Sequence, residues 1–191
     1  WTNEEGARFA PAMLSSGVWT GQFSEAYAHA RADHDGITVG EALDNIGYRG
    51  EAPARAFPVY ACYELHIEQG PILEDEGLDI GLVRAAMGQR WFTLTLDGFA
   101  AHAGTTPMHS RRDALTAFAE LALKVEEIGY RHAPDGRATI GMAQVTPNSR
   151  NVVPSRVVCS VEFRHPALTA LEAMEAALHK VAESLSLRGV A

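Results

Sequence analysis

The sequence is poor in the features that mark several large classes of protein. It contains only two cysteines, Cys62 and Cys159, and they do not share the close spacing of a zinc-finger pair. Each lies in an apolar, strand-like run, so we expect both to be buried, reduced thiols in a cytoplasmic protein. No stretch approaches the roughly 20 consecutive apolar residues of a membrane span, so we expect no membrane partner.

Positive charge is also scarce. Lys and Arg total 16 against 24 Asp and Glu, a formal net charge of −8, which argues against a nucleic-acid partner and against a polybasic membrane surface. The remaining composition, 47% hydrophobic and 21% charged, is ordinary for a globular protein with one large or two small domains. Small molecules or other proteins are therefore the expected partners.

The first half of the sequence, residues 1–88, is typical of part of an α/β domain. Thr38 and Glu41 form a capping-box pattern for a helix that ends at Gly47. Residues 57–67 are rich in aromatic and β-branched types and stop before a Gly-Pro pair, which predicts a strand. A second short strand is expected within residues 76–83.

A different pattern begins near Gln89. Residues 91–98 alternate with a period of two, as in a half-buried antiparallel strand, and further strands are expected at 138–145 and 157–163. Two amphipathic helices are predicted, the first capped from Ser110 and the second from Thr169. Their expected buried faces are Leu115, Phe118, Leu121, Val125 and Ile128, and Leu171, Met174, Leu178, Val181 and Leu185. The order β-α-β-β-α lacks one strand of a ferredoxin-like βαββαβ unit, so we expect a piece of a longer protein, cut at both ends.

Two acidic motifs carry the candidate chemistry of the first half. Glu4 and Glu5 are adjacent, so their carboxylates diverge on an extended backbone, and one can hold a metal ion while the other reaches a bound water. His66 lies between Glu64 and Glu68, where carboxylates can fix its tautomer for metal binding. A solvated acidic turn and a hydrogen-bonded structural histidine are the alternatives.

Three further candidates lie in the second half. The loop 98–108 surrounds His102 with small residues, which allow a ligand to approach closely. Asn151 lies in a polar, turn-prone loop, and Arg164 closes the strand that follows, where a guanidinium can bind a carboxylate through two hydrogen bonds. A surface histidine, a solvated loop and a surface salt bridge remain the alternatives.

Together and in this order, these motifs strongly resemble the hydantoinase/carbamoylase family of metal-dependent amidases. That family includes N-carbamoyl-L-amino-acid hydrolases, β-ureidopropionases and allantoate amidohydrolases, and belongs with the aminoacylase and carboxypeptidase-like metallohydrolases. The matching segments are WTNEEGARF at 1–9, ELHIEQGP at 64–71, AHAGTTPM at 101–108, RRDA at 111–114, NVVP at 151–154 and EFRHP at 162–166.

The resemblance implies a site with two divalent ions, Zn, Mn, Co or Ni. Glu4 resembles the general base that activates a metal-bridging water, Glu5 a ligand of one ion, and His66 a ligand of the other. The family's full site also needs an N-terminal histidine, a bridging aspartate and a C-terminal histidine, and no segment here matches them. We therefore expect this 191-residue chain by itself to bind no metal tightly and to be inactive.

The resemblance also implies a substrate. Gln69 and His102 resemble groups that engage it, with His102 stabilising the developing oxyanion, and Asn151 and Arg164 resemble the pair that binds its carboxylate. The implied reaction is hydrolysis of the carbamoyl C–N bond of N-carbamoyl-L-amino acids or related ureido acids. Allantoate hydrolysis is the alternative, because GQR at 88–90 and AHAGTTPM also fit that branch. A peptide-cleaving activity is disfavoured, since the peptidase branch is expected to have an acidic residue at the position of His66.

The implied architecture has two domains. Residues 1–88 would be part of a zinc-aminopeptidase-like catalytic domain, and residues 89–191 an inserted α+β ferredoxin-like lid that mediates homodimerisation, with its final strand missing. Closure of the lid would bring Arg164 and His102 toward the metals and exclude water. A segment that serves only as a dimerisation or ligand-binding module is a further alternative.

Overall fold

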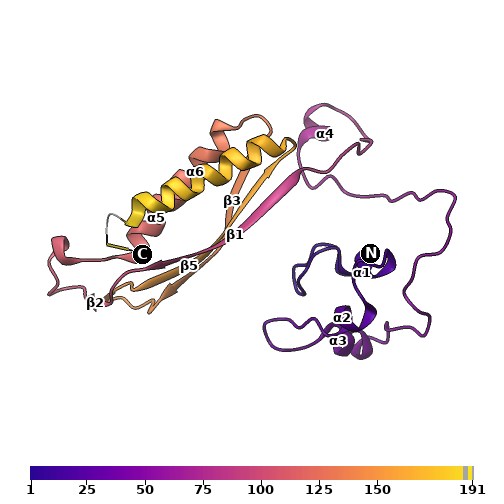
Figure 1. Ribbon diagram of the computed structural model, residues 1–191, viewed down its shortest axis with the longest axis horizontal. Coiled ribbons are helices and arrows are strands. Elements are labelled where there is room, and N and C mark those ends of the chain that lie inside the picture. Colours follow the sequence, from indigo (N-terminus) through magenta and orange to yellow (C-terminus); the bar gives the residue numbers. More distant parts are fainter. Residues whose placement is uncertain (187–188, 191) are drawn as a thin grey trace. The chain divides into compact units, whose positions relative to one another are not determined.

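The chain forms two structural units, Trp1–Pro71 and Ile72–Ala191. The computed structural model (Figure 1) describes residues 1–186 and 189–190. The division between the units falls before the boundary expected near Gln89, whereas the first strand of the sheet begins at Gly88, beside that boundary. The assignment of residues 1–88 to a catalytic domain stays a prediction.

The first unit is a small cluster of short helices. These are α1 (Leu14–Trp19), α2 (Glu25–His29) and α3 (Val39–Asn45). Helices of this length are marginal in water by themselves, so packing must hold them. The packed residues are Phe9, Leu14, Val18, Ala28 and Val39. The predicted capping box of Thr38 and Glu41 is confirmed, and Gly47, at a φ of 68°, follows the end of α3.

The predicted strand at residues 57–67 is wrong. The segment forms no strand, and its aromatic and aliphatic side chains are exposed, with Tyr60 and Leu65 fully so. A strand needs a neighbour to pair its N–H and C=O groups, and none of the described segments pairs with this one. The strand expected within 76–83 is absent from the described structure for the same reason. Cys62 lies in the first run and is exposed, contrary to expectation, whereas Cys159 is buried.

The second unit is a three-stranded antiparallel sheet with two long helices on one face (Figure 1). The unit begins with a helical turn, α4 (Ile72–Asp75), which precedes the sheet in the chain. The sheet order is β1-β5-β3, with β1 (Gly88–Asp97), β3 (Arg137–Thr146) and the central β5 (Arg156–His165). The helices are α5 (Ala114–Arg131) and α6 (Leu168–Ser186). The three predicted strands and both helices are therefore confirmed, in the predicted β-α-β-β-α order.

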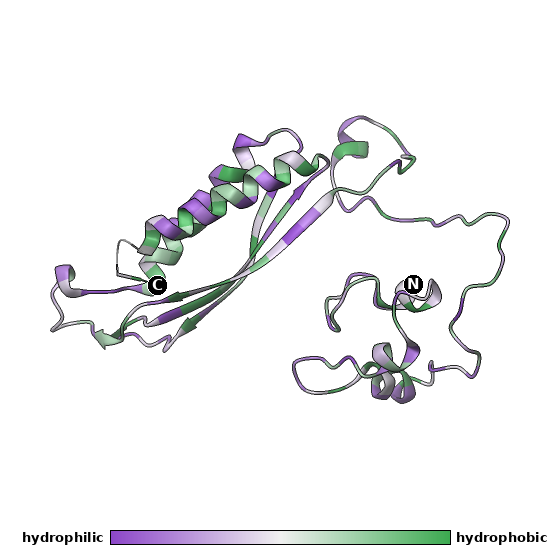
Figure 2. Cartoon of the chain, viewed as in Figure 1, coloured by the Kyte–Doolittle hydropathy of each residue, from purple (hydrophilic) through white to green (hydrophobic). Residues whose placement is uncertain are grey.

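The core lies between the helices and the sheet. Alternate residues of β5 point into it: Val157, Cys159, Val161 and Phe163. Hydrophobic and hydrophilic bands alternate along α5 and α6 in Figure 2, as amphipathic helices require. The predicted helix faces are buried or partly buried, except that Leu115 is exposed.

Both predicted caps of these helices are wrong. Helix α5 is capped by Asp113, whose side chain accepts hydrogen bonds from two backbone N–H groups of the first turn, and not by Ser110, which lies in a short 3₁₀ turn. Helix α6 already includes Thr169, so that residue is not its cap. Each error has the same cause, because a polar residue near a helix start fits the capping pattern at more than one position.

The strand order leaves β1 and β3 at the two edges of the sheet. Each edge presents backbone groups that the described sheet does not pair, and such an edge is a surface for pairing with a further strand. Among the described residues, no helix combines the length and apolar character that crossing a bilayer demands.

Candidate functional site

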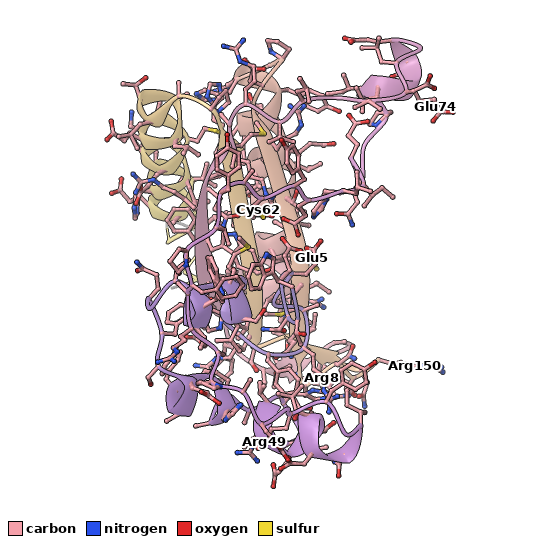
Figure 3. All side chains as sticks on the ribbon, turned by 90° about the vertical axis from the view of Figure 1, so that its right-hand side faces the viewer. Glu5, Arg8, Arg49, Cys62, Glu74 and Arg150 are labelled. Carbon is pink, nitrogen blue, oxygen red and sulfur yellow. The ribbon has the colours of Figure 1, made fainter. Side chains whose placement is uncertain are left out.

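The Glu4-Glu5 pair lies in a tightly closed loop of the first unit. The side chain of Asn3 donates to two carbonyl oxygens of this loop, at 2.8 and 3.3 Å. Gly6 has a φ of 70°, and a Cβ there would lie 2.6 Å from the backbone nitrogen of Ala12, so only glycine fits. The loop leaves Glu4 half-buried and Glu5 exposed, and Figure 3 labels Glu5 on it.

His66 lies within electrostatic reach of this pair. Its Nδ1 is 2.8 Å from the Ile67 carbonyl oxygen, so in the neutral ring Nδ1 carries the hydrogen and Nε2 keeps its lone pair. That hydrogen bond is the main cause that raises the pKa of His66; partial desolvation opposes it, and the charges of Glu4, Glu64 and Glu5 add to it. Residues from opposite ends of the first unit are thus brought together, and their roles stay predictions.

These residues do not complete a metal site. Throughout the part of the chain that the structure describes, no three His, Cys, Asp or Glu side chains gather closely enough to hold an ion. By donor type, the Glu5 carboxylate and the His66 imidazole fit zinc or manganese, but a catalytic zinc ion needs three protein ligands. Gln69, the other predicted residue here, is exposed and turns the chain with a φ of 53°.

In the second unit, a two-stranded ribbon brings His102 and Asn151 together. Strand β2 (Ala101–His102) pairs antiparallel with β4 (Val152–Val153), and the N–H of Ala103 donates to the Asn151 carbonyl at 2.9 Å. The two loops are separated in sequence by α5 and β3, so only the tertiary structure makes them neighbours. The Asn151 side-chain oxygen accepts from the Ser149 hydroxyl at 2.9 Å, which leaves the amide NH₂ as the donor.

The orientation of the His102 ring is set by the backbone of its own loop. The N–H groups of Gly104 and Thr105 donate to its Nδ1, at 3.0 and 3.3 Å. A nitrogen that accepts hydrogen bonds carries no hydrogen, so the neutral ring carries it on Nε2. The exposed imidazole therefore offers an N–H donor, which suits the predicted stabilisation of an oxyanion.

Arg164 is held by a carboxylate on its own strand. Its Nε donates to Glu162 Oε1 at 2.6 Å, and the same oxygen accepts from Trp91 Nε1 at 3.0 Å. Glu162 was not among the predicted site residues, although its i, i+2 spacing from Arg164 already puts both on one face of β5. Trp91 lies opposite Glu162 in the register of β1 and β5. The Arg164 side chain is 48% exposed, which leaves its terminal NH₂ groups accessible to a carboxylate.

The structure does not bring Arg164 to His102 and Asn151. Arg164 lies near the end of β5 that leads into α6, whereas the ribbon adjoins the other end, where the N–H of Gly98 donates to the Ser155 carbonyl at 2.7 Å. From residue 156 to residue 164, a rise of about 3.3 Å per residue spans about 26 Å. Within one copy of this unit, Arg164 therefore lies far along the sheet from His102 and Asn151.

Comparison with known proteins supports the resemblance. Residues 84–190 match the model of the peptidase dimerisation domain. The chain is 43% identical, over 98% of its length and 45% of the relative's, to an N-carbamoyl-L-amino-acid amidohydrolase of Rhizobium meliloti. It is 39% identical to an allantoate amidohydrolase of Bacillus subtilis (strain 168), over 88% of this chain and 42% of that protein.

A solved structure extends the comparison to the fold. The crystal structure of an amidase of the hydantoinase/carbamoylase family from Burkholderia vietnamiensis is similar with a TM-score of 0.87 and 53% identity, over 100% of this chain and 46% of that one. The chain thus spans a little under half the length of the relatives it matches. The matches confirm the family that the motifs predicted: residues 84–190 match the peptidase dimerisation domain, and the chain belongs to the hydantoinase/carbamoylase family of amidases.

Proposed function

We propose that the chain is part of a metal-dependent amidohydrolase that cleaves the carbamoyl C–N bond of N-carbamoyl-L-amino acids or related ureido acids. The observation that carries the proposal is the 43% identity to an N-carbamoyl-L-amino-acid amidohydrolase along 98% of the chain. Residues 1–88 are proposed as part of the catalytic domain, and residues 89–191 as a ferredoxin-like lid.

In this proposal, Glu4 is the general base. It takes the proton of the attacking water and delivers it to the leaving nitrogen. Glu5 and His66 would each hold one of two divalent ions, with the remaining ligands supplied by other parts of the full-length protein. When bound, the ions supply an activated water and polarise the carbonyl group. The Nδ1 contact of His66 supports its role, because it keeps the Nε2 lone pair for a ligand bond.

The second unit would bind the substrate. The Nε2–H of His102 donates to the oxygen that becomes negative in the transition state, where such donors contribute most. Asn151 and Arg164 bind the carboxylate, and Arg164 supplies the positive charge. Gln69 contributes a further polar contact. The Glu162 carboxylate fixes Nε of Arg164 and thereby aims its terminal NH₂ groups.

Within one copy, the Arg164 end of β5 and the end near His102 and Asn151 are about 26 Å apart. A homodimer could bring these two groups together from different copies. A groove of about 590 Å³ lies between α5 and the first residues of the edge strand β3. It is lined by Ala119, Ala122, Leu123, Val125, Glu126, Ala138, Thr139 and Ile140. We propose that two copies pair here about a two-fold axis, so that β3 runs antiparallel to its partner. The two-fold axis reverses the direction of the sheet in the partner copy. The end of β5 near His102 and Asn151 in one copy then lies on the same side of the dimer as the Arg164 end of β5 in the other.

Allantoate hydrolysis is the second candidate. It is favoured by the 39% identity to an allantoate amidohydrolase. Both substrates carry a carboxylate and a ureido group, so the residues proposed above suit either, and the described structure holds no contact that separates the two.

Parallel hydrolysis assays test the proposal. The full-length protein, supplied with zinc or manganese, would be offered an N-carbamoyl-L-amino acid, allantoate and a dipeptide, and the amino product and ammonia would be measured. We expect the carbamoyl compound to give the highest kcat/KM. Glu4→Gln should lower kcat by about 10² to 10⁴, the range of a general base, whereas Glu51→Gln, at an exposed glutamate, should not. Cleavage of the dipeptide alone, or full activity of Glu4→Gln, would contradict the proposal.

A further inference from the structure

The loop that carries His102 is held by Arg111, a residue that has no role in the function proposed above. Nη2 of Arg111 donates to the Ala103 carbonyl oxygen at 2.6 Å, and Nε donates to the Thr106 carbonyl oxygen at 3.0 Å. The guanidinium is half-buried and spans the turn from one end to the other. Its planar fork can bind both carbonyls at once, which an ammonium group cannot reproduce.

These two contacts act on the groups that orient the imidazole. The Ala103 carbonyl and the Gly104 N–H belong to one planar peptide unit, so a bond that fixes the carbonyl also fixes the direction of the N–H. That N–H donates to His102 Nδ1 at 3.0 Å. At the other end of the turn, the N–H of Thr106 donates to the His102 carbonyl at 3.1 Å. Arg111 therefore binds the turn at both ends, and through the Ala103 carbonyl it fixes the peptide whose N–H holds the ring.

The ring also packs directly on Gly104. A Cβ at this position would lie 3.2 Å from His102 Cε1 and 3.4 Å from Nδ1, so the imidazole would have to shift by a few tenths of an ångström. The change would leave the hydrogen bonds of Arg111 in place. Gly104→Ala thus displaces the ring by a route independent of the arginine.

We propose that Arg111 is a positioning residue for His102. By holding the Ala103–Gly104 peptide, it keeps the ring with Nδ1 as acceptor and Nε2–H directed outward as the donor. The effect on catalysis rests on the proposed function, which assigns Nε2–H to the oxyanion. The effect on the ring itself does not, so the two can be tested separately.

The neighbouring arginine provides a matched control. Arg112 is exposed, and its guanidinium makes no hydrogen bond to the described residues. Arg111→Gln and Arg112→Gln remove the same charge one position apart, but only the first removes the bonds to the turn. Arg111→Lys keeps the charge and can bond one carbonyl at a time, so it should have an intermediate effect.

The first measurement concerns the ring and needs no activity. In the 191-residue chain, nitrogen NMR identifies the tautomer of His102, assigned by loss of its signals in His102→Gln. We expect one tautomer, Nε2–H, in the natural chain and in Arg112→Gln. In Arg111→Gln the Nδ1–H form should become detectable, and the Gly104 amide should exchange with solvent about five- to tenfold faster, the loss of one hydrogen bond.

The second measurement concerns the proposed reaction in the full-length protein. Arg111→Gln should lower kcat about 10- to 100-fold, the effect of a misplaced catalytic donor, with KM within about twofold. The loss falls on kcat because the oxyanion exists only in the transition state. The kcat of Arg111→Lys should lie between those of Arg111→Gln and the natural protein. Gly104→Ala should also lower kcat, and Arg112→Gln should have the kcat of the natural protein.

Three results would overturn the proposal: an unchanged tautomer and Gly104 exchange rate in Arg111→Gln, equal losses in the two glutamine variants, or a higher KM with kcat intact. If Arg111→Gln does not fold, natural values of kcat in both Arg111→Lys and Gly104→Ala would overturn it. If the natural full-length protein hydrolyses none of the substrates, the proposed function fails, and the NMR measurement still decides whether Arg111 positions the ring.

Discussion

Truncation of Leu121 tests how the second unit is held together. Leu121 lies on α5 with 0% of its surface exposed, in the core between the helices and the sheet. Leu123, two positions further along the same helix, is 69% exposed. Replacement of either by alanine removes the same three carbon atoms and slightly favours the helix, so a comparison of the two variants isolates the effect of burial.

The magnitude follows from those carbon atoms. At about 0.8 kcal/mol for each buried carbon, Leu121→Ala loses about 2.4 kcal/mol of transfer free energy. A cavity that collapses only in part raises the loss to about 3 to 4 kcal/mol. Leu123→Ala should change the free energy of unfolding by less than about 0.5 kcal/mol.

Urea unfolding followed by far-ultraviolet circular dichroism is the suitable assay, because α5 and α6 are the longest helices of the described chain. With an m-value of about 2 kcal/mol per molar urea, Leu121→Ala should lower the midpoint by about 1.5 to 2 M. The midpoints should be measured at several protein concentrations, since Leu123 lines the groove proposed for dimerisation and association stabilises the native state.

Equal midpoints for the two alanine variants would refute the reasoning. They would mean that the interface between α5 and the sheet does not carry the stability of this unit. A midpoint of Leu123→Ala that is lowered at high protein concentration and equals that of the natural chain at low concentration would instead agree with both the core and the proposed dimer.

Three further predictions concern charge, thiols and metal. The hydrogen bond from Arg156 lowers the pKa of Asp97, so this pair stabilises the fold above the ordinary carboxyl pKa and stops doing so as the pH falls through the lowered value. Asp97→Asn should therefore lower the urea midpoint at neutral pH, and the difference should vanish in acid. An alkylating reagent should modify the exposed Cys62 of the native chain and spare Cys159, whose pKa is raised by burial. Calorimetric titration of the 191-residue chain with zinc or manganese should show no tight binding, because its ligand set is incomplete.

Each of these has a clear contrary result. A midpoint difference for Asp97→Asn that persists in acid would assign the effect to packing and not to charge. Rapid alkylation of Cys159 in the native chain would show that the core opens readily. Tight binding of two ions by the chain would show that Glu5 and His66 belong to a complete site.

Local patterns in the sequence were sufficient to predict most of the second unit. The period-two alternation of residues 91–98 predicted β1, and the apolar faces of α5 and α6 predicted both the helices and most of their buried residues, because one face of each element packs against the same core. The motifs and their order in the amino-acid sequence also indicated the family. In both cases the information is local, since a pattern within one segment already states which side must be buried or which chemistry its residues suit.

Which segments become neighbours could be seen only once the chain was folded. Residues 57–67 have the composition of a strand, yet they remain unpaired in the described structure, because a strand exists only with a partner. The ribbon of β2 and β4 joined His102 to Asn151, and the length of β5 kept Arg164 away from both. The physical reason is that hydrogen-bond pairing and distance along a sheet depend on residues far apart in the chain, which no local periodicity records.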